Sequence, residues 1–218
     1  GNQYYKITEK GKVKIAAEDV IKFKNPVTNT DGNNLILGGI KKIEDTPTKK
    51  GIFESAKNKV DDIASALTGK SKTQRQLESL GIKSEVKDIG LKVDGTTKTG
   101  LDIDEALENN LGRTFKTYDQ YDETTKTATS VKSIDMTSET YISGSGLNNV
   151  LNKYGKDMDK FFEYRLKGVY LNKADIDQSV LKIVINNEPL NKSQIENLKK
   201  FVENANKSGK KVEAIILK

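Results

Sequence analysis

Apolar residues follow two different periodicities along this chain, and each predicts a different kind of element. Near the N-terminus, the runs at 4–7 and 12–15 are rich in β-forming residues and predict short strands, with a turn-rich stretch at 29–34 after them. Apolar residues then recur at helical spacing over 52–67 and predict a helix that ends at Gly69. We therefore expect a small β-rich unit followed by a helix.

This pattern divides the chain into two domains. A polar stretch at 44–51 resembles a linker, and a second short helix is predicted at 73–80. We place the boundary near residue 76, so that a domain of residues 1–76 precedes a domain of residues 77–218. The 218 residues are enough for two small domains that each bury a core.

The second domain is predicted to begin with a helix and a hairpin. The helix covers 103–111 and is ended by Gly112. Two β-type runs follow at 113–119 and 127–132, and a polar turn at 122–126 separates them. Two such runs joined by a short polar turn indicate a β-hairpin.

The rest of the chain alternates helices and strands. An apolar stripe predicts a long helix at 145–165, an apolar run at 179–185 predicts a buried strand, and a helix at 193–206 precedes a last strand at 212–217. A strand, a helix and a strand of these lengths form a right-handed parallel crossover. The sequence thus predicts an α/β fold, whose mixed sheet combines a hairpin with a parallel β-α-β unit.

The residue types that are missing restrict the chemistry. The chain contains no Cys and no His, which excludes disulfides, thiolate nucleophiles, Ser-His-Asp hydrolases and zinc sites with Cys or His ligands. Catalysis must therefore use carboxylates, lysines or hydroxyls. A bound divalent metal ion would meet oxygen ligands, which favours magnesium or manganese, with zinc as an alternative.

The net charge of +6 suggests nucleic-acid binding, but its distribution does not support that interpretation. Residues 1–76 contain 15 Lys and Arg against 9 Asp and Glu, whereas residues 77–218 contain 22 of each. Phosphate binding by the second domain must therefore rest on local patches. No apolar run approaches the roughly 20 residues that span a bilayer, so we expect no membrane insertion.

Four residues of the second domain could form a catalytic group. Side chains alternate along a strand, so Ser130 and Lys132 point to the same face of the sheet. In a hairpin centred on the polar turn, Asp119 lies across from residues 129–131 and within reach of both. Glu105 on the preceding helix could point to the same end of the sheet. Carboxylates that hold a metal ion, together with an ammonium group, are the components of a metal-assisted phosphodiester hydrolase.

Each of the four residues also has an ordinary structural explanation. A carboxylate beside a turn can cap it, and a glutamate on a helix can simply be solvated. A serine or lysine on a strand can be an ordinary surface residue. Spacing alone therefore does not establish a site.

Two segments of the hairpin resemble a known family. Residues 115–119 (FKTYD) and 128–135 (ATSVKSID) resemble the signature of CdiA C-terminal toxins of contact-dependent growth inhibition (CDI). The resemblance is to the branch with a PD-(D/E)XK, restriction-endonuclease-like tRNase domain. It continues through 153–169 and 181–185 and covers roughly the second half of the chain. The second domain is therefore expected to have a PD-(D/E)XK nuclease-like core.

The resemblance implies an activity and a role for each member of the group. It implies a metal-dependent endoribonuclease that cleaves tRNA. Asp119 would be the metal-ligating aspartate, residues 130–132 would occupy the (D/E)XK position, and Glu105 would be the acid carried by the helix. The implied catalytic residues are thus Glu105, Asp119, Ser130 and Lys132.

Ser130 stands where the wider superfamily has Asp or Glu. This toxin branch is similar in having serine at that position. Serine is a weak metal ligand, so Glu105 and the carbonyl of Val131 are expected to contribute more of the metal binding beside the aspartate. Asp102 and Asp104 lie close enough along the chain for either of them to take the place of Glu105.

Several lysines outside this group could contact the phosphates of bound RNA. They are Lys116 in the first strand of the hairpin and Lys153, Lys156, Lys160 and Lys167 along the long helix. A solvated charged face is the simpler explanation for the helix lysines. Contacts of this kind would position the RNA and would not read its sequence.

The resemblance also implies a biological setting. Toxins of this family are the C-terminal part of a large secreted exoprotein, carry a variable cytoplasm-entry domain before the nuclease and are neutralised by a cognate CdiI-type immunity protein. We therefore expect residues 1–76 to be such an entry domain. The start at Gly1 fits a piece of a longer protein that is displayed at the cell surface and delivered to the cytoplasm of a target cell.

Two other functions fit the same features. A DNA endonuclease of the same fold is one, because a metal site alone does not choose between DNA and RNA backbones. A non-catalytic adhesion or assembly module of a secreted protein is the other, and the β-rich first domain would suit it.

Overall fold

The computed structural model describes residues 3–8, 11–15, 26–28, 34–37 and 47–218, with side chains from residue 57 onward. The chain forms two compact units, Gly1–Lys70 and Ser71–Lys218, and each is described by itself. The boundary that we expected near residue 76 falls inside helix α3 (Lys72–Ser79) of the second unit.

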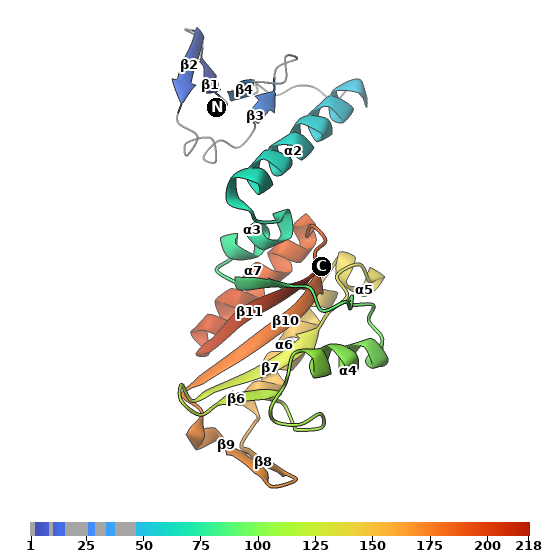
Figure 1. Ribbon diagram of the computed structural model, residues 1–218, viewed down its shortest axis with the longest axis vertical. Coiled ribbons are helices and arrows are strands. Elements are labelled where there is room, and N and C mark those ends of the chain that lie inside the picture. Colours follow the sequence, from blue (N-terminus) through green and yellow to red (C-terminus); the bar gives the residue numbers. More distant parts are fainter. Residues whose placement is uncertain (1–2, 9–10, 16–25, 29–33, 38–46) are drawn as a thin grey trace. The chain divides into compact units, whose positions relative to one another are not determined.

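The first unit contains a four-stranded sheet in the order β2-β1-β4-β3 (Figure 1). Its strands are β1 (Gln3–Thr8), β2 (Gly11–Ile15), β3 (Pro26–Thr28) and β4 (Asn34–Leu37). β1 and β2 cover the two short strands that the sequence predicted, and they pair antiparallel. Helix α2 (Pro47–Thr68) begins inside the stretch that we interpreted as a linker, and most of the expected turn at 29–34 lies outside the described residues.

The second unit is built on a five-stranded sheet in the order β5-β11-β10-β7-β6. The strands are β5 (Lys83–Lys87), β6 (Gln120–Asp122), β7 (Thr127–Ser133), β10 (Gln178–Asn186) and β11 (Lys210–Leu217). β5, β11, β10 and β7 are parallel, whereas β6 runs antiparallel to β7 at the edge. This arrangement confirms the predicted α/β fold, in which a hairpin joins a parallel β-α-β unit.

Helices cover both faces of this sheet. On one face, α6 (Gly146–Asp159) and α7 (Lys192–Lys207) bury Leu151 and Phe201 against Leu181 and Ile183. On the other face, α4 (Thr97–Ala106) buries Ile103 against Val131 and Val184. The remaining short elements are α5 (Glu139–Ile142), β8 (Glu163–Leu166), β9 (Val169–Asn172) and a 3-10 turn, η1 (Lys173–Asp175). No helix in the described part of the chain is long and apolar enough to cross a membrane.

The segment between α4 and β7 differs from the prediction. The helix expected at 103–111 begins earlier, at a cap in which the Thr96 hydroxyl accepts the N–H of Thr99, and it ends at Ala106. The strand expected at 113–119 is a loop, and β6 starts only at Gln120. Positive φ angles at Gly112 (89°) and Thr117 (73°) bend the chain there, a conformation that a strand does not contain.

The prediction of a long helix at 145–165 is also wrong in part. Helix α6 stops at Asp159, and residues that we assigned to its last turns form the hairpin β8–β9 instead. Positive φ angles at Lys167 (47°) and Gly168 (85°) form the turn of this hairpin. The apolar residues at 161–164 fit a helical stripe as well as the start of a strand, so their spacing could not separate the two.

Gly146, the first residue of α6, provides a test of this packing. A Cβ atom at this position would collide with the backbone oxygen of Thr140, so Gly146→Ala should lower the free energy of unfolding by about 1–3 kcal/mol. Gly155 in the same helix has room for a methyl group, with Phe201 Cε2 3.5 Å from the added Cβ. Gly155→Ala should therefore stabilise the unit by about 0.5–1 kcal/mol. Urea unfolding measures both, and equal effects of the two substitutions would contradict this packing.

Candidate active site

Asp119 lies at the point where the pairing of β6 with β7 ends. Its N–H donates to the carbonyl of Thr129 over 2.9 Å, which continues the ladder by one bond. Its Oδ2 atom accepts the N–H of Val131 at 2.7 Å and lies 3.3 Å from Nζ of Lys132. The hairpin therefore brings the carboxylate and the lysine together.

The edge of β7 is open beyond Asp119, because β6 pairs only with residues 127–129. In a strand, the N–H and C=O groups of one residue point to the same side. The N–H of Val131 points to Asp119, so its carbonyl also faces this open edge. A carboxylate and a backbone carbonyl thus face the same place.

Ser130 and Lys132 differ in accessibility. Ser130 pairs with Leu181 of the central strand β10 and is 2% exposed, so a substrate could not reach it without movement of the chain. The side chain of Lys132 is 31% exposed, and that of Asp119 is 15% exposed. Of Asp119, Ser130 and Lys132, a ligand can therefore contact only Asp119 and Lys132.

Helix α4 contributes two neighbouring acids with different environments. Burial, followed by the negative charge of Asp119, raises the pKa of Asp104 from 3.8 to about 6, although the charges of Lys132 and Arg113 oppose this shift. Glu105 has a side chain that is 79% exposed and lies 3.7 Å from the guanidinium of Arg113. The structure therefore places Asp104 in the electrostatic environment of Asp119 and Lys132, whereas the side chain of Glu105 is mostly exposed and is paired with Arg113.

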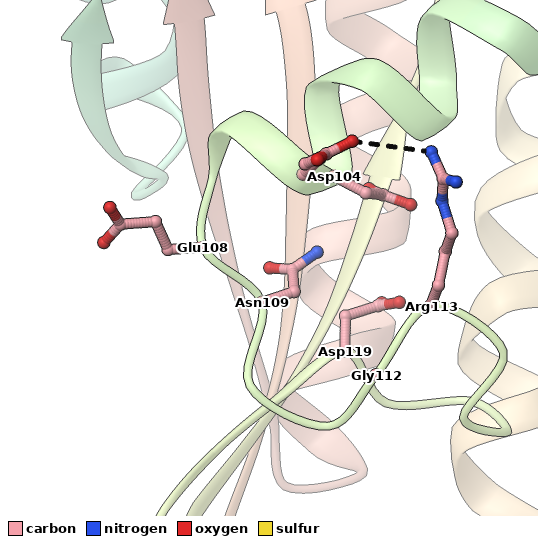
Figure 2. Close-up of a pocket in the computed structure, with 7 residues that line it drawn as sticks. Asp104, Glu108, Asn109, Gly112, Arg113 and Asp119 are labelled. Carbon is pink, nitrogen blue, oxygen red and sulfur yellow. Dashed lines mark ion pairs between the residues drawn. The ribbon is translucent and has the colours of Figure 1, made fainter.

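These residues border a cavity of about 300 Å³ between α4 and the loop that precedes β6 (Figure 2). Its lining consists of Asp104, Glu105, Glu108, Asn109, Gly112, Arg113 and Asp119. Four of these positions, at 108, 109, 112 and 113, were not identified from the sequence. Assigning 113–119 to a strand hid them, because it placed Arg113 several residues away from Asp119 along a sheet edge. The positive φ of Gly112 instead turns the chain back.

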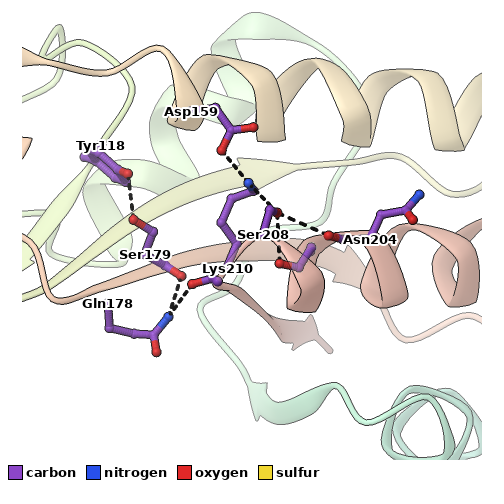
Figure 3. Close-up of polar contacts among 9 residues, drawn as sticks. Tyr118, Asp159, Gln178, Ser179, Asn204, Ser208 and Lys210 are labelled. Carbon is purple, nitrogen blue, oxygen red and sulfur yellow. Dashed lines mark hydrogen bonds and ion pairs between the residues drawn. The ribbon is translucent and has the colours of Figure 1, made fainter.

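Tyr118, which directly precedes Asp119 in the chain, is anchored in the core. It is 2% exposed, its ring packs edge-on against Phe161 with centroids 5.0 Å apart, and its hydroxyl lies 3.0 Å from Oγ of Ser179 (Figure 3). Burial raises the pKa of Tyr118, against the effect of the Ser179 hydrogen bond. A residue fixed in this way gives Asp119 a defined position.

A buried cation lies in the same region of the core. Lys210 is 7% exposed, and its Nζ donates to Asp159 over 2.5 Å and to Oγ of Ser208 over 2.7 Å (Figure 3). These bonds tie the start of β11 to the end of α6. A lysine that is enclosed and paired in this way is not available to a substrate.

The donors at this site fit a divalent cation. In the described residues, no three Asp or Glu side chains form a group that could hold a metal ion. Asp104 and Asp119 nevertheless lie close enough for the charge of one to raise the pKa of the other, and a cation between them would offset that repulsion. With the Val131 carbonyl they offer three oxygen ligands of the kind that magnesium and manganese prefer, and water can complete the coordination.

The lysines that we considered as RNA contacts are not at this cavity. Lys153, Lys156 and Lys160 border a separate hollow of about 370 Å³ along the exposed face of α6, with two asparagines and Asp157. Lys167 lies in the turn of the β8–β9 hairpin and not on a helix, which corrects our assignment. The remaining one, at position 116, is exposed in the loop that leads to Tyr118.

This unit was compared with known protein families, curated proteins and solved structures. A protein-family model described as "CDI toxin restriction endonuclease-like domain" matches residues 99–216, which is more than half of the chain. A solved structure described as "CdiA-CT/CdiI toxin and immunity complex from Yersinia pseudotuberculosis" contains a similar chain with 25% identity and a TM-score of 0.46, over 51% of this chain and 90% of that chain. Among curated proteins, none matches. By the match to the family model, the chain belongs to the family of CDI toxin restriction endonuclease-like domains.

Proposed function

We propose that this chain is a metal-dependent nuclease toxin that cleaves tRNA in target bacteria. Membership of the CDI toxin family supports a nuclease toxin. One observation carries the chemistry: Asp104, Asp119 and Lys132 interact electrostatically at the open edge of β7, beside a cavity of about 300 Å³. The choice of tRNA rests on the sequence resemblance alone.

In this proposal, Asp104, Asp119 and the carbonyl of Val131 hold a divalent ion. When bound, such an ion supplies a Lewis acid for the phosphate and lowers the pKa of a coordinated water. Lys132 is held by Asp119 at 3.3 Å, and its ammonium group stabilises the negative charge that develops on the phosphate oxygens. Ser130 supports the strand from inside the sheet.

Asp104 therefore takes the role that the resemblance assigned to Glu105. The two acids are adjacent on α4 and both border the cavity with Asp119, but their side chains leave the helix about 100° apart and therefore have different neighbours. Asp104 is half-buried and responds to the charge of Asp119, whereas the carboxylate of Glu105 is mostly solvated. A bound cation would offset both the partial burial of Asp104 and its repulsion by Asp119, whereas a solvated carboxylate has less of this cost to offset.

The family also supports a biological setting. We propose that the chain is part of a large secreted exoprotein, that its first unit serves entry into the target cell, and that a cognate CdiI-type immunity protein neutralises the nuclease unit. The lysines at 116, 153, 156 and 160 would add nonspecific phosphate contacts. Co-expression with a candidate immunity protein tests this part of the proposal, because the growth of cells that express the chain should recover only with the cognate protein.

A cleavage assay separates the candidate functions. Purified chain is incubated with total tRNA and with duplex DNA, each with Mg²⁺, Mn²⁺ or Zn²⁺ and with EDTA. Metal-dependent cleavage of tRNA supports the proposal. Cleavage of DNA alone supports a DNA endonuclease of the same fold, since the site does not distinguish the two backbones. Absence of cleavage with every metal and both substrates would favour an adhesion or assembly module.

A further inference from the structure

Arg113 is the single cation among the seven residues that line the site cavity. Four of the other lining residues are acidic. A phosphodiester that enters this cavity would therefore meet mainly negative charge unless a metal ion and Arg113 offset it. Figure 2 shows Arg113 extending from the loop beside Asp119 to α4, with its guanidinium at the helix.

The backbone of Arg113 is fixed relative to Asp119. The N–H of Phe115 donates to the carbonyl of Gly112 over 3.0 Å and closes a turn around Arg113. Phe115 is 6% exposed, and its ring packs edge-on against Tyr164 with centroids 5.1 Å apart. At the other end, the N–H of Leu111 donates to the carbonyl of Asp119 over 3.1 Å. One closed loop thus presents Arg113 and Asp119 to the same cavity.

The side chain of Arg113, by contrast, is held only weakly. Its ion pair with Glu105 spans 3.7 Å, and the two side chains are 54% and 79% exposed. Exposed pairs of this kind contribute little to stability, so the guanidinium can exchange one anion for another at small cost. A planar guanidinium can bind two phosphate oxygens at once. Its contact with the Glu105 carboxylate, at 3.7 Å, is too long to be a hydrogen bond of this kind.

We infer that Arg113 binds the phosphodiester of the substrate and that Glu105 holds the guanidinium at the cavity when no substrate is bound. This inference rests on the proposed nuclease function and adds a substrate-binding residue to it. The roles of the two acids on α4 then differ: Asp104 faces the metal site, and Glu105 serves as the exchangeable partner of Arg113.

Salt-dependent binding tests the role of Arg113. The affinity for a fluorescently labelled nucleic acid, either tRNA or duplex DNA according to which one is cleaved, is measured by anisotropy at several salt concentrations. The buffer contains Ca²⁺ in place of Mg²⁺, at a concentration at which no cleavage is seen, so that a divalent ion is available to the acidic cavity. Arg113→Ala should weaken binding by roughly 10- to 100-fold and reduce the slope of log affinity against log salt by about one. Arg113→Lys should keep the slope, because the charge remains, but bind more weakly than wild type. Lys199→Ala removes an exposed charge on α7 and serves as the matched control.

Glu105→Gln gives an effect of opposite sign. Releasing Arg113 from its partner should tighten binding by about two- to fivefold. An unchanged salt slope in Arg113→Ala, or weaker binding by Glu105→Gln, would overturn this inference. If the wild type is active in the same preparations, the proposed nuclease function is not affected by that result. A wild type that neither binds nor cleaves nucleic acid would instead overturn the proposed function, and Arg113 would have no substrate to bind.

Discussion

Asp119→Asn should reduce nucleic-acid cleavage by about 100- to 1,000-fold and leave the fold intact. Asparagine keeps an oxygen that can accept the N–H of Val131, now at 2.7 Å, so the loop and the hairpin remain in place. It removes the charge that holds Lys132 and that, in our proposal, binds the metal ion. Single-turnover cleavage and urea unfolding, measured side by side, separate a chemical defect from a loss of structure.

Asp122→Asn is the matched control for this substitution. Asp122 lies at the other end of β6, and its Oδ1 atom accepts the backbone N–H groups of Thr124 and Thr125 in the hairpin turn. It makes no contact with the cavity, so its replacement should leave cleavage within about threefold of wild type. Equal loss of activity in the two variants would mean that the hairpin, and not the carboxylate at its base, limits activity.

Two adjacent acids on α4 give the second prediction. Asp104→Asn should lower cleavage by about 100-fold or more, because it removes the carboxylate that interacts with Asp119. Glu105→Gln should change the maximal cleavage rate by less than about fivefold, because this acid is solvated and paired only with Arg113. The two variants are well matched, because both residues lie on α4 and each substitution removes one negative charge with almost no change of shape.

The dependence of cleavage on metal concentration adds a second readout to this pair. Asp104→Asn should need a higher Mg²⁺ or Mn²⁺ concentration for half-maximal cleavage, and Glu105→Gln should not. The reverse order, with Glu105→Gln the more damaging change, would restore Glu105 as the acid of the metal site.

Alternation along β7 was enough to predict that Lys132 lies near Asp119. Because side chains of a strand change faces at each residue, the positions of Ser130 and Lys132 relative to Asp119 followed from a hairpin centred on the polar turn. In the structure Asp119 contacts Lys132 and the N–H of Val131, although β6 is only three residues long and its pairing with β7 ends at Gln120. Ser130, which we also expected within reach of Asp119, is 2% exposed. A prediction from the alternation of side chains along one strand does not depend on the length of the partner strand.

The assignment on α4 was less certain because it depended on helical phase. Each residue along a helix turns the side chain by about 100°, so an error in register moves a different acid to the sheet. The expected helix at 103–111 would have had other neighbours than the observed Thr97–Ala106. Local sequence does not determine that phase, which depends on Ile103 packing against Val131 and Val184.

Arg113 could not have been identified without the loop conformation. Its place at the cavity depends on the positive φ of Gly112 and Thr117 and on the burial of Phe115. Apolar and β-forming residues in this stretch made a strand the better local prediction. Tertiary packing of Phe115 and Tyr118 overrode that preference, as it often does for short β-type runs.

The central claim is that this unit cleaves nucleic acid with a metal ion at the group formed by Asp104, Asp119 and Lys132. The most direct test is single-turnover cleavage by wild type and Lys132→Ala, each with divalent metal and with EDTA. We predict metal-dependent cleavage by wild type and a loss of about 100-fold or more in Lys132→Ala. Full activity of Lys132→Ala, or cleavage by wild type that continues in EDTA, would contradict the account.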